Sequence, residues 1–402
     1  MSRSELLKHL EADALDIEIR YREWADHRAR CPLEKVDEAS STPGMDPSSF
    51  AAMAPSGEDL YIAWRHDDVA QVMRDAEHFM KPGPPWRKTK TLLSMNGDEH
   101  RHYRQVLEDA LSPRAMAEVE ASIISPIMNR LIDEFATRGH ADLVEEFTSH
   151  FPFHVIRTMI GFDESDHDEF IGLAYPGAGG LNAEWEGRVA EFLAPRVEAA
   201  RAEPGDDLLG LLVRAEVDGH PLSDEELYQY LLLLIPAGAD TTFAGTSNLL
   251  AGLLLHPDQF DLVRGDDGLV PRAVDEALRW QNPAATSFLR RAIEETEVAG
   301  TVVTPGTTIC AHLSSHNRDE TKYEAPDAFC VTRPRPPRGI FGYGPHACLG
   351  KHLARAEMRT ALRLLLRRLP NLRLDPDFPR PIIRAVGFAS PASLHVLFDP
   401  AT

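Results

Sequence analysis

The ten residues from Phe341 to Gly350, FGYGPHACLG, constrain the fold of this chain more than any other segment. Their glycines allow the backbone to turn tightly and to approach a flat ligand without a Cβ clash. The residues that follow, 349–365, have the apolar spacing of an amphipathic helix. We therefore expect a tight loop that presents Cys348 at the beginning of a helix, where the N-terminal amides favour a thiolate over a thiol.

Three interpretations of Cys348 follow from the residues alone. A thiolate metal ligand suits the loop, and one metal-bound thiolate donates electron density strongly to a haem iron. A small buried hydrophobe is the usual role of a lone cysteine. A zinc site with His346 and His352 is the third, although no CxxC pair supplies a second ligand cluster. The spacing within the loop does not exclude zinc by itself.

A second chemistry-bearing segment lies in the helical pattern over 231–248. Ala237 and Thr241 fall on one face at helical spacing, and Pro236 within the run predicts a local kink or weakened hydrogen bonding. Asp240 beside the Thr241 hydroxyl is the acid–alcohol pair that stepwise proton delivery requires. The alternative is that Thr241 bonds back to the Ala237 carbonyl while Asp240 is solvated.

Charged pairs at helical spacing occur twice more. Glu276 and Arg279 stand at i and i+3, which is usually a surface ion pair of a few tenths of a kcal/mol. His100 and Arg104 share a helical face at i and i+4, and Arg290 lies in a strand-like run. Taken singly, His100, Arg104 and Arg290 are more often exposed than ligand-bound, but a dianionic ligand nearby makes bidentate arginine contacts the better explanation.

The cysteine run resembles the haem-binding loop of the cytochrome P-450 superfamily, F-G-x-G-x-(H or R)-x-C-x-G, and fills every fixed position. The resemblance implies haem b as the cofactor, with Cys348 as the axial iron ligand. It further implies that His346 pairs with a haem propionate and that Phe341 packs beside the sulfur. The 237–242 segment resembles the family's oxygen-activating motif, which assigns Asp240 to proton relay and Thr241 to stabilising bound dioxygen.

The resemblance extends to the cofactor's cations. His100 and Arg104 look like the family's H-x-x-x-R element, and Arg290 aligns with the strand arginine, so all three are expected to reach the propionates. Residues 95–99 lack the proline that usually precedes that element.

The Glu276–Arg279 pair resembles the family's Glu-Arg pair that buttresses the haem loop, a structural role. The family often adds a third cation, but position 328 is an alanine in this chain. Ala328 cannot supply that charge, and either Arg333 or Arg335 is available to replace it.

By family position, a mostly apolar set of residues lines the substrate pocket: Leu233, Ala237, Ala284, Ala285, Thr286, Val386, Phe388 and parts of 79–92. A hydrophobic small organic molecule is therefore the expected substrate. Arg87, Lys88 and Lys90 stand in the loop expected to cover this pocket. We interpret them as a solvated charge run, with attraction of a carboxylated substrate as the alternative.

The pattern along the chain predicts a mainly α fold with a minor β portion. Helices are expected over 116–138, 185–202 and 223–255, and strands over 288–293, 307–313 and 394–398. The first 65 or so residues look irregular because Ser, Pro, Gly and Met crowd residues 40–57. The resemblance implies one domain over 1–402, with the haem between the oxygen-activating helix and the cysteine loop with its helix.

Composition limits the partners and the location. The formal net charge of −21 argues against nucleic acid, whose phosphates need a basic face. No apolar run of about 18 residues occurs, so we expect no membrane span and a cytoplasmic protein like the bacterial members of the family. Lys351, His352 and Arg355 predict a local basic patch for an acidic electron carrier, or simply a solvated helix face.

The predicted function is a haem-thiolate monooxygenase that inserts one oxygen atom from O2 into its substrate. The sequence has neither a GxGxxG fingerprint nor a cysteine cluster, so electrons must come from separate proteins. The resemblance implies a ferredoxin and its NAD(P)H-dependent reductase. The alternatives are a peroxide-driven peroxygenase, which typically replaces the acid–alcohol pair, and a non-catalytic haem-binding or recruitment module.

Overall fold

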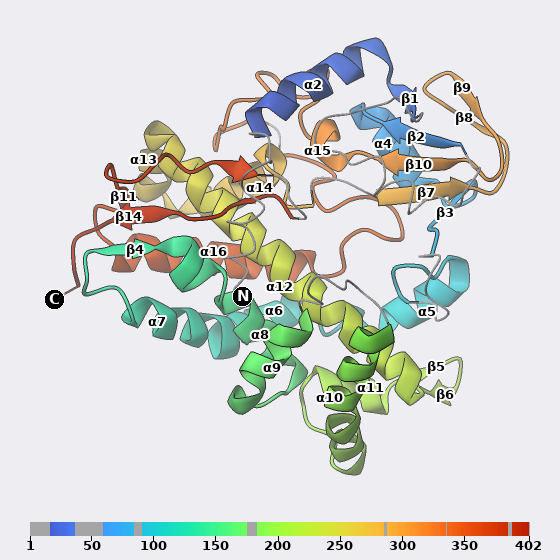
Figure 1. The fold of residues 1–402 in the computed structure, drawn as a ribbon, viewed down its shortest axis with the longest axis horizontal. Coiled ribbons are helices and arrows are strands. Elements are labelled where there is room, and N and C mark those ends of the chain that lie inside the picture. The colour runs from blue at the N-terminus through green and yellow to red at the C-terminus, as the bar shows by residue number, and fades with distance from the viewer. Residues whose placement is uncertain are drawn as a thin grey trace.

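The computed structural model describes residues 17–36, 59–83, 91–174, 183–284, 288–334, 336–384 and 388–401. Helices dominate it, with a sheet set to one side (Figure 1). The α-helices are α2 Ile17–Arg30, α4 His66–Arg74, α5 Gly97–Glu108, α6 Pro113–Val119, α7 Ser125–Asp133, α8 Phe151–Ile160, α9 His167–Ala174, α10 Ala183–Ala202, α11 Leu208–Arg214, α12 Asp224–Leu255, α13 Pro257–Gly265, α14 Val270–Trp280, α15 Leu313–His316 and α16 Lys351–Arg368. The strands are β1 Leu33–Lys35, β2 Leu60–Ala63, β3 Phe79–Met80, β4 His140–Asp142, β5 Glu216–Val217, β6 His220–Pro221, β7 Phe288–Ala292, β8 Thr296–Val298, β9 Thr301–Val303, β10 Thr308–Ala311, β11 Arg373–Leu374, β12 Ile383–Arg384, β13 Ser390–Pro391 and β14 His395–Leu397.

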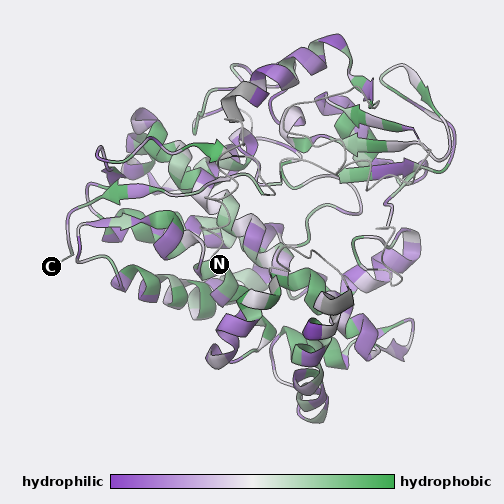
Figure 2. Cartoon of the chain, in the orientation of Figure 1, coloured by the Kyte–Doolittle hydropathy of each residue, from purple (hydrophilic) through white to green (hydrophobic). Residues whose placement is uncertain are grey.

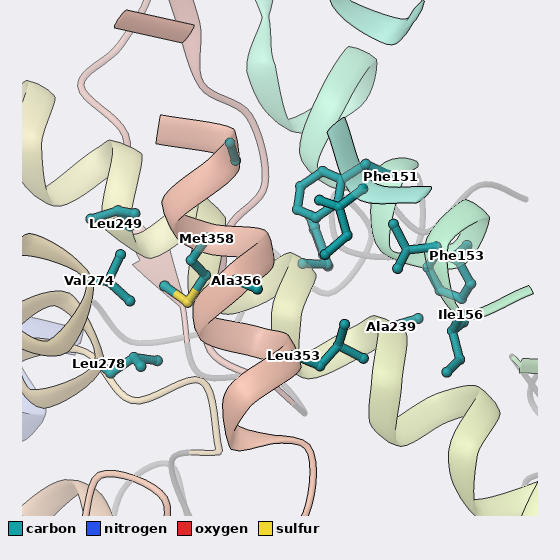
Figure 3. Close-up of a cluster of buried hydrophobic side chains, with 14 of the residues drawn as sticks. Phe151, Phe153, Ile156, Ala239, Leu249, Val274, Leu278, Leu353, Ala356 and Met358 are labelled. Atoms are coloured by element: carbon teal, nitrogen blue, oxygen red, sulfur yellow. The ribbon is translucent and has the colours of Figure 1, made fainter. Parts of the chain in front are cut away.

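The long helix α12 is the axis of the fold. Its start is fixed by a capping box, in which the Ser223 hydroxyl accepts from the Glu226 amide and the Glu226 carboxylate accepts from the Ser223 amide. The predicted helix over 223–255 is therefore confirmed, and it continues through Pro236. Helices α8, α14 and α16 pack against α12. Figure 3 shows their apolar side chains meeting, with Leu353 of α16 beside the part of α12 that carries Ala239.

The helix expected over 116–138 is wrong in detail. It is divided into α6, a π-helical turn at Glu120–Ile124, and α7, which ends at Asp133. Pro126 explains the division, because a proline in the first turn of α7 cannot donate the hydrogen bond that a continuous α-helix needs there. The helix expected over 185–202 lies within α10.

The N-terminal segment was expected to be irregular, and two described parts of it are regular. α2 and β1 occupy most of residues 17–35, and β2 begins at Leu60. Tertiary packing explains the error, because Tyr21 and Trp24 of α2 are buried and Trp24 contacts the His312 ring at 4.8 Å between centroids. The Ser/Pro/Gly-rich residues 40–57 lie outside the described residues.

Five strands form a sheet in the order β1-β2-β10-β7-β3, with β2 and β10 parallel and the other pairs antiparallel. β10 is shorter than the predicted strand because His312 caps α15, which begins at Leu313. Figure 2 shows β2 and β10 as mostly hydrophobic, whereas β7 has a hydrophilic stretch. The sequence of β7 contains two arginines, Arg290 and Arg291. The sheet thus brings one arginine into the interior, since Arg290 is only 3% exposed.

Candidate functional site

The cysteine loop closes on itself by backbone hydrogen bonds. The Cys348 amide donates to the Phe341 carbonyl at 2.9 Å, and the Ala347 amide donates to the Gly344 carbonyl at 3.0 Å. Gly344 has a φ of +68°, and a Cβ there would lie 2.5 Å from the Met73 carbonyl oxygen. Only glycine therefore allows the loop to lie this close to α4 while it delivers Cys348 to the start of α16.

The Cys348 thiol combines two properties that seldom occur together. Its residue is exposed, yet burial among protein atoms raises the pKa of the thiol, more than the Gly350 amide and the Arg104 guanidinium lower it. The thiol is therefore accessible to a bound group although protein atoms surround much of it. Because its pKa is raised, the thiol needs a bound metal ion to hold it as a thiolate.

This geometry decides between the other interpretations of Cys348. An accessible thiol is no buried filler of the core. Among the described residues no three His, Cys, Asp or Glu side chains are grouped to hold a metal ion, so the zinc set is not assembled. The His346 ring instead stacks on His100, with 4.0 Å between centroids.

Four residues predicted to hold the propionates meet beside the loop. His100 from α5 and Arg290 from β7 are 2% and 3% exposed. Burial, with the neighbouring His100, Arg290 and Arg104, lowers the pKa of His346 to about 3. The Arg104 Nε also donates to Glu108 at 3.0 Å.

A fifth cation, Lys81, joins the same group and was missed in the sequence. It stands just after β3, and its charge also lowers the pKa of His346. No spacing rule marks it, because β3 pairs with β7 across more than 200 residues.

The arrangement suits an anionic iron porphyrin. It offers one accessible thiol as a metal ligand and, around His346 of the same loop, a set of cationic side chains. The Arg290 guanidinium donates to the Leu289 carbonyl at 2.9 Å and has no carboxylate partner among the residues that the structure describes. Buried cations without carboxylates need an external anion. The residues present therefore fit haem.

The middle of α12 holds the expected acid–alcohol pair. The Thr241 hydroxyl donates to the Ala237 carbonyl at 2.9 Å, so the back-bonded alternative for this residue is what the structure has. That bond engages the hydroxyl proton and leaves the oxygen lone pairs free to accept. Asp240 is 8% exposed, so the solvated alternative for its carboxylate is wrong.

A buried acid on α16 is a second residue missed by sequence reasoning. Glu357 is fully buried, and burial raises its pKa well above the usual range, while the Thr242 hydroxyl nearby lowers it only in part. The sequence gives only a weak signal, because Glu357 stands between Ala356 and Met358 in a helix that also carries Arg355 and Arg359. Burial thus favours the protonated form of this side chain, which lies next to Thr242 of α12.

The Glu276–Arg279 pair is buried rather than superficial. Arg279 donates to both carboxylate oxygens of Glu276, at 2.8 and 2.9 Å, and to the backbone carbonyls of Asn317, Pro326 and Ala328. Arg333 lies on the same carboxylate at 3.2 Å. Arg333 thus takes the place left by Ala328, while Arg335 lies outside the described residues.

The predicted pocket residues are only partly described. Leu233 is half-buried and Ala237 is exposed on one face of α12. Ala284 and Phe388 belong to neighbouring segments, because the Ala389 amide donates to the Pro283 carbonyl at 3.0 Å and both segments border α12 through Asn248. Several other predicted positions lie outside the described residues: Ala285, Thr286, Val386, Arg87, Lys88 and Lys90.

The predicted basic patch is partly neutralised. The Arg355 Nε donates to Asp275 at 2.8 Å, and its guanidinium lies over the Phe341 ring, 4.6 Å from the centroid. Lys351 and His352 occupy the first turn of α16 and are half-buried. In the described parts of the chain, no helix is long and apolar enough to cross a membrane.

Comparisons with known proteins identify the family of the chain. The cytochrome P450 family model matches residues 268–395. The chain is 31% identical to cytochrome P450 107B1 of Saccharopolyspora erythraea, over 80% of this chain and 85% of that protein. It is 32% identical to a steroid C26-monooxygenase of Mycolicibacterium smegmatis, over 85% of this chain and 88% of the relative.

Solved structures give the same result for the fold. CYP108D1 from Novosphingobium aromaticivorans superposes with a TM-score of 0.84 at 26% identity, covering 95% of this chain and 94% of the other. A mutant of P450 EryK in complex with erythromycin B gives a TM-score of 0.83 at 26% identity, covering 97% and 100%. The predicted mainly helical P450 fold and the haem cofactor are confirmed. The chain belongs to the cytochrome P450 family and is a haem-thiolate monooxygenase.

Proposed function

We propose that Cys348 is the axial ligand of the haem iron and that His100, Arg104, Arg290 and His346 hold the propionates. The observation that carries this assignment is the accessible yet desolvated Cys348 thiol, two residues from His346, whose charged neighbours include the buried Arg290 without a carboxylate partner among the described residues. When bound, the haem supplies O2 activation and the transfer of one oxygen atom to an organic substrate. The remaining chemistry is proton delivery and binding, and it falls to this chain's side chains.

Asp240 and Thr241 are assigned to proton delivery. Thr241 is held with its hydroxyl proton on the Ala237 carbonyl, so its oxygen accepts a hydrogen bond from a protonated group or a water in the site. Asp240 is the neighbouring acid, 8% exposed, that passes protons to that position. The acid–alcohol pair favours O2-dependent chemistry over a peroxygenase, because a peroxide-driven enzyme does not need two protons to be delivered to the site.

Electrons are supplied by a separate ferredoxin with its NAD(P)H-dependent reductase. The chain has no flavin fingerprint and no cysteine cluster. An acidic carrier would meet an overall charge of −21, so it needs a local basic contact. Lys351 and His352, close to the haem loop, are that contact, with Arg355 contributing less because Asp275 offsets its charge.

The substrate is a bulky hydrophobic molecule of the steroid or macrolide type. Relatives at 31–33% identity include a C-19 steroid 1alpha-hydroxylase and a mycinamicin IV hydroxylase/epoxidase. Ala237, exposed on α12, and Ala284, half-buried in a neighbouring segment, are small apolar side chains that suit contact with such a molecule. A screen of steroids, macrolides and fatty acids for the low-spin to high-spin change in haem absorbance tests this class. A response to fatty acids alone would contradict it.

Replacing the ligand tests the site itself. Cys348→Ser should abolish the thiolate-type carbon monoxide spectrum of the reduced protein, because serine does not supply the thiolate donor. The matched control Cys330→Ser, a half-buried cysteine elsewhere, should retain that spectrum. An unchanged spectrum in Cys348→Ser would refute the assignment.

A second assay separates the alternative functions. The reconstituted ferredoxin system should turn over faster than hydrogen peroxide alone, and Thr241→Ala should divert electrons to peroxide and water rather than product. Faster turnover with peroxide alone would favour a peroxygenase. Absence of product with both systems, despite a substrate-induced spin change, would favour a non-catalytic haem-binding module.

A further inference from the structure

The geometry around β3 places Lys81 beside Arg290. In the antiparallel pairing of β3 with β7, Phe79 is opposite Ala292 and Met80 is opposite Arg291. Continuing this register by one residue sets Lys81 opposite Arg290, and directly opposite residues of an antiparallel pair share a face of the sheet. Lys81 and Arg290 therefore lie on one face, while Arg291 lies on the other.

The Lys81 backbone is tied to the helix that carries two other cations. The Lys81 amide donates to the Asn96 Oδ1 at 2.7 Å, and the Asn96 Nδ2 donates to the Lys81 carbonyl at 3.0 Å. Asn96 is the residue just before α5, which carries His100 and Arg104. This two-way bond holds the end of β3 and the start of α5 together, so Lys81 does not depend on its own loop for its position.

No carboxylate faces the Lys81 ammonium in the described parts of the chain. Its Nζ lies over the Phe288 ring, 5.8 Å from the centroid, and Arg290 is the charged group next to it. Burial and Arg290 together lower the pKa of Lys81 to about 8. Other lysines have carboxylate partners, such as Lys35 with Asp59 and Lys322 with Asp67. A desolvated ammonium beside a buried guanidinium is costly unless an anion joins them.

The charges of the other site residues leave a role for Lys81. Low pKa values keep His346, and in part His100, neutral until an anion approaches. Arg104 already has Glu108 as a counter-charge. Arg290 and Lys81 are thus the two cations of the group that have no carboxylate partner within the described residues, and a haem has two propionates.

We propose that Lys81 is a haem-binding residue that pairs with a propionate alongside Arg290. This inference rests on the haem site proposed above and adds a residue to it. In Lys81→Gln, the rate at which the ferric holoprotein loses haem to excess apomyoglobin should rise about tenfold, as expected for the loss of one charge-assisted hydrogen bond. The ferric/ferrous reduction potential should fall, because removal of a positive charge favours the ferric form.

Two variants make the test specific. Lys81→Arg keeps the charge and should lose haem within about twofold of the wild-type rate. Arg291→Gln removes one charge from the opposite face of the same sheet and should leave both the rate and the potential unchanged. Equal haem loss from Lys81→Gln and Arg291→Gln, with the thiolate-type carbon monoxide spectrum intact in both, would overturn the role of Lys81. The assignment of Cys348 as the haem ligand would not be affected, because the carbon monoxide spectrum of Cys348→Ser tests it separately.

Discussion

Arg333 should be important for the stability of this molecule, because it supplies the third cation that Ala328 cannot. Its guanidinium lies on the Glu276 carboxylate at 3.2 Å and donates to the carbonyls of Glu324 and Ala328 at 2.6 and 2.9 Å. Glu276 is 2% exposed and also binds Arg279. Arg333→Ala therefore removes a brace from a buried carboxylate without leaving that carboxylate unpaired.

The expected cost follows from these contacts. A hydrogen bond to a charged group contributes about 1.5–3 kcal/mol, and Arg333→Ala loses bonds to a buried carboxylate and to backbone carbonyls. We expect a loss of about 2–3 kcal/mol in the free energy of unfolding. Arg279→Ala should cost more, about 3–5 kcal/mol, because it removes the closer partner of the same buried charge.

Thermal unfolding of the holoprotein, followed by the haem absorbance, measures the loss. For a chain of this length an unfolding entropy of about 2 cal/mol/K per residue converts 2–3 kcal/mol into a midpoint lower by roughly 3 °C. The exposed ion pair of Arg363 with Asp267 supplies the control, and Arg363→Ala should lower the midpoint by about 1 °C or less.

A second substitution tests whether the charge or the position matters. Ala328 is exposed, so a longer side chain fits there, and Ala328→Arg in the Arg333→Ala background should recover part of the lost midpoint. The reasoning is refuted if Arg333→Ala shifts the midpoint no more than Arg363→Ala does.

Three further predictions concern other parts of the site and the core. Gly344→Ala should lower the ratio of haem to protein absorbance in the purified enzyme, because its Cβ would lie 2.5 Å from the Met73 carbonyl oxygen; full haem content would contradict this. Glu357→Gln should be more stable than the wild type by a margin that grows as the pH rises above about 4.5, because burial raises the pKa of this carboxyl in the folded state above its value in the unfolded state; denaturant midpoints at pH 4.5 and 7 measure the margin, and an equal margin at both would contradict it. Burial lowers the pKa of His312 and His316 to about 3, so only the unfolded state gains protons as the pH falls below 6.5; each should cost roughly 2 kcal/mol at pH 5, and His316→Gln should flatten the urea midpoint between pH 7 and 5.

Local spacing predicted those parts of the site that are close together in the chain. The loop glycines, the His100–Arg104 pair and the capped helix α12 each depend on residues within a few positions of one another, and the structure has them as expected. The alternative interpretation of Thr241, a hydrogen bond to the Ala237 carbonyl, is also what the structure has, because a threonine inside a helix reaches the carbonyl four residues earlier. Fold class and cofactor followed from the motif order.

The contributions of Lys81 and Glu357 were beyond that reasoning, and the choice between Arg333 and Arg335 stayed open, for a physical reason. Arg333 reaches Glu276 across 57 residues, and Lys81 meets Arg290 through a strand pairing that spans more than 200 residues. Glu357 looks like one polar residue on an amphipathic helix until α12 is seen to cover it. Such contacts depend on which elements pack together, and the hydrophobic periodicity of a helix (3.6 residues) or a strand (2 residues) does not predict that packing.

The acidity of the chain and the basicity of its haem site are two parts of one arrangement. With 63 acidic against 42 basic residues, an arginine or lysine placed at random would soon meet a carboxylate. On α16 this is the case for Arg355 and Arg368, which bond Asp275 and Asp133. Around Cys348 the described carboxylates are kept away from Arg290 and Lys81, at the cost of burying uncompensated positive charge. That cost is recovered only when the dianionic cofactor binds, so haem binding and stability of the fold are linked. A carboxylate introduced among these cations should therefore weaken haem retention even if it stabilises the fold without haem.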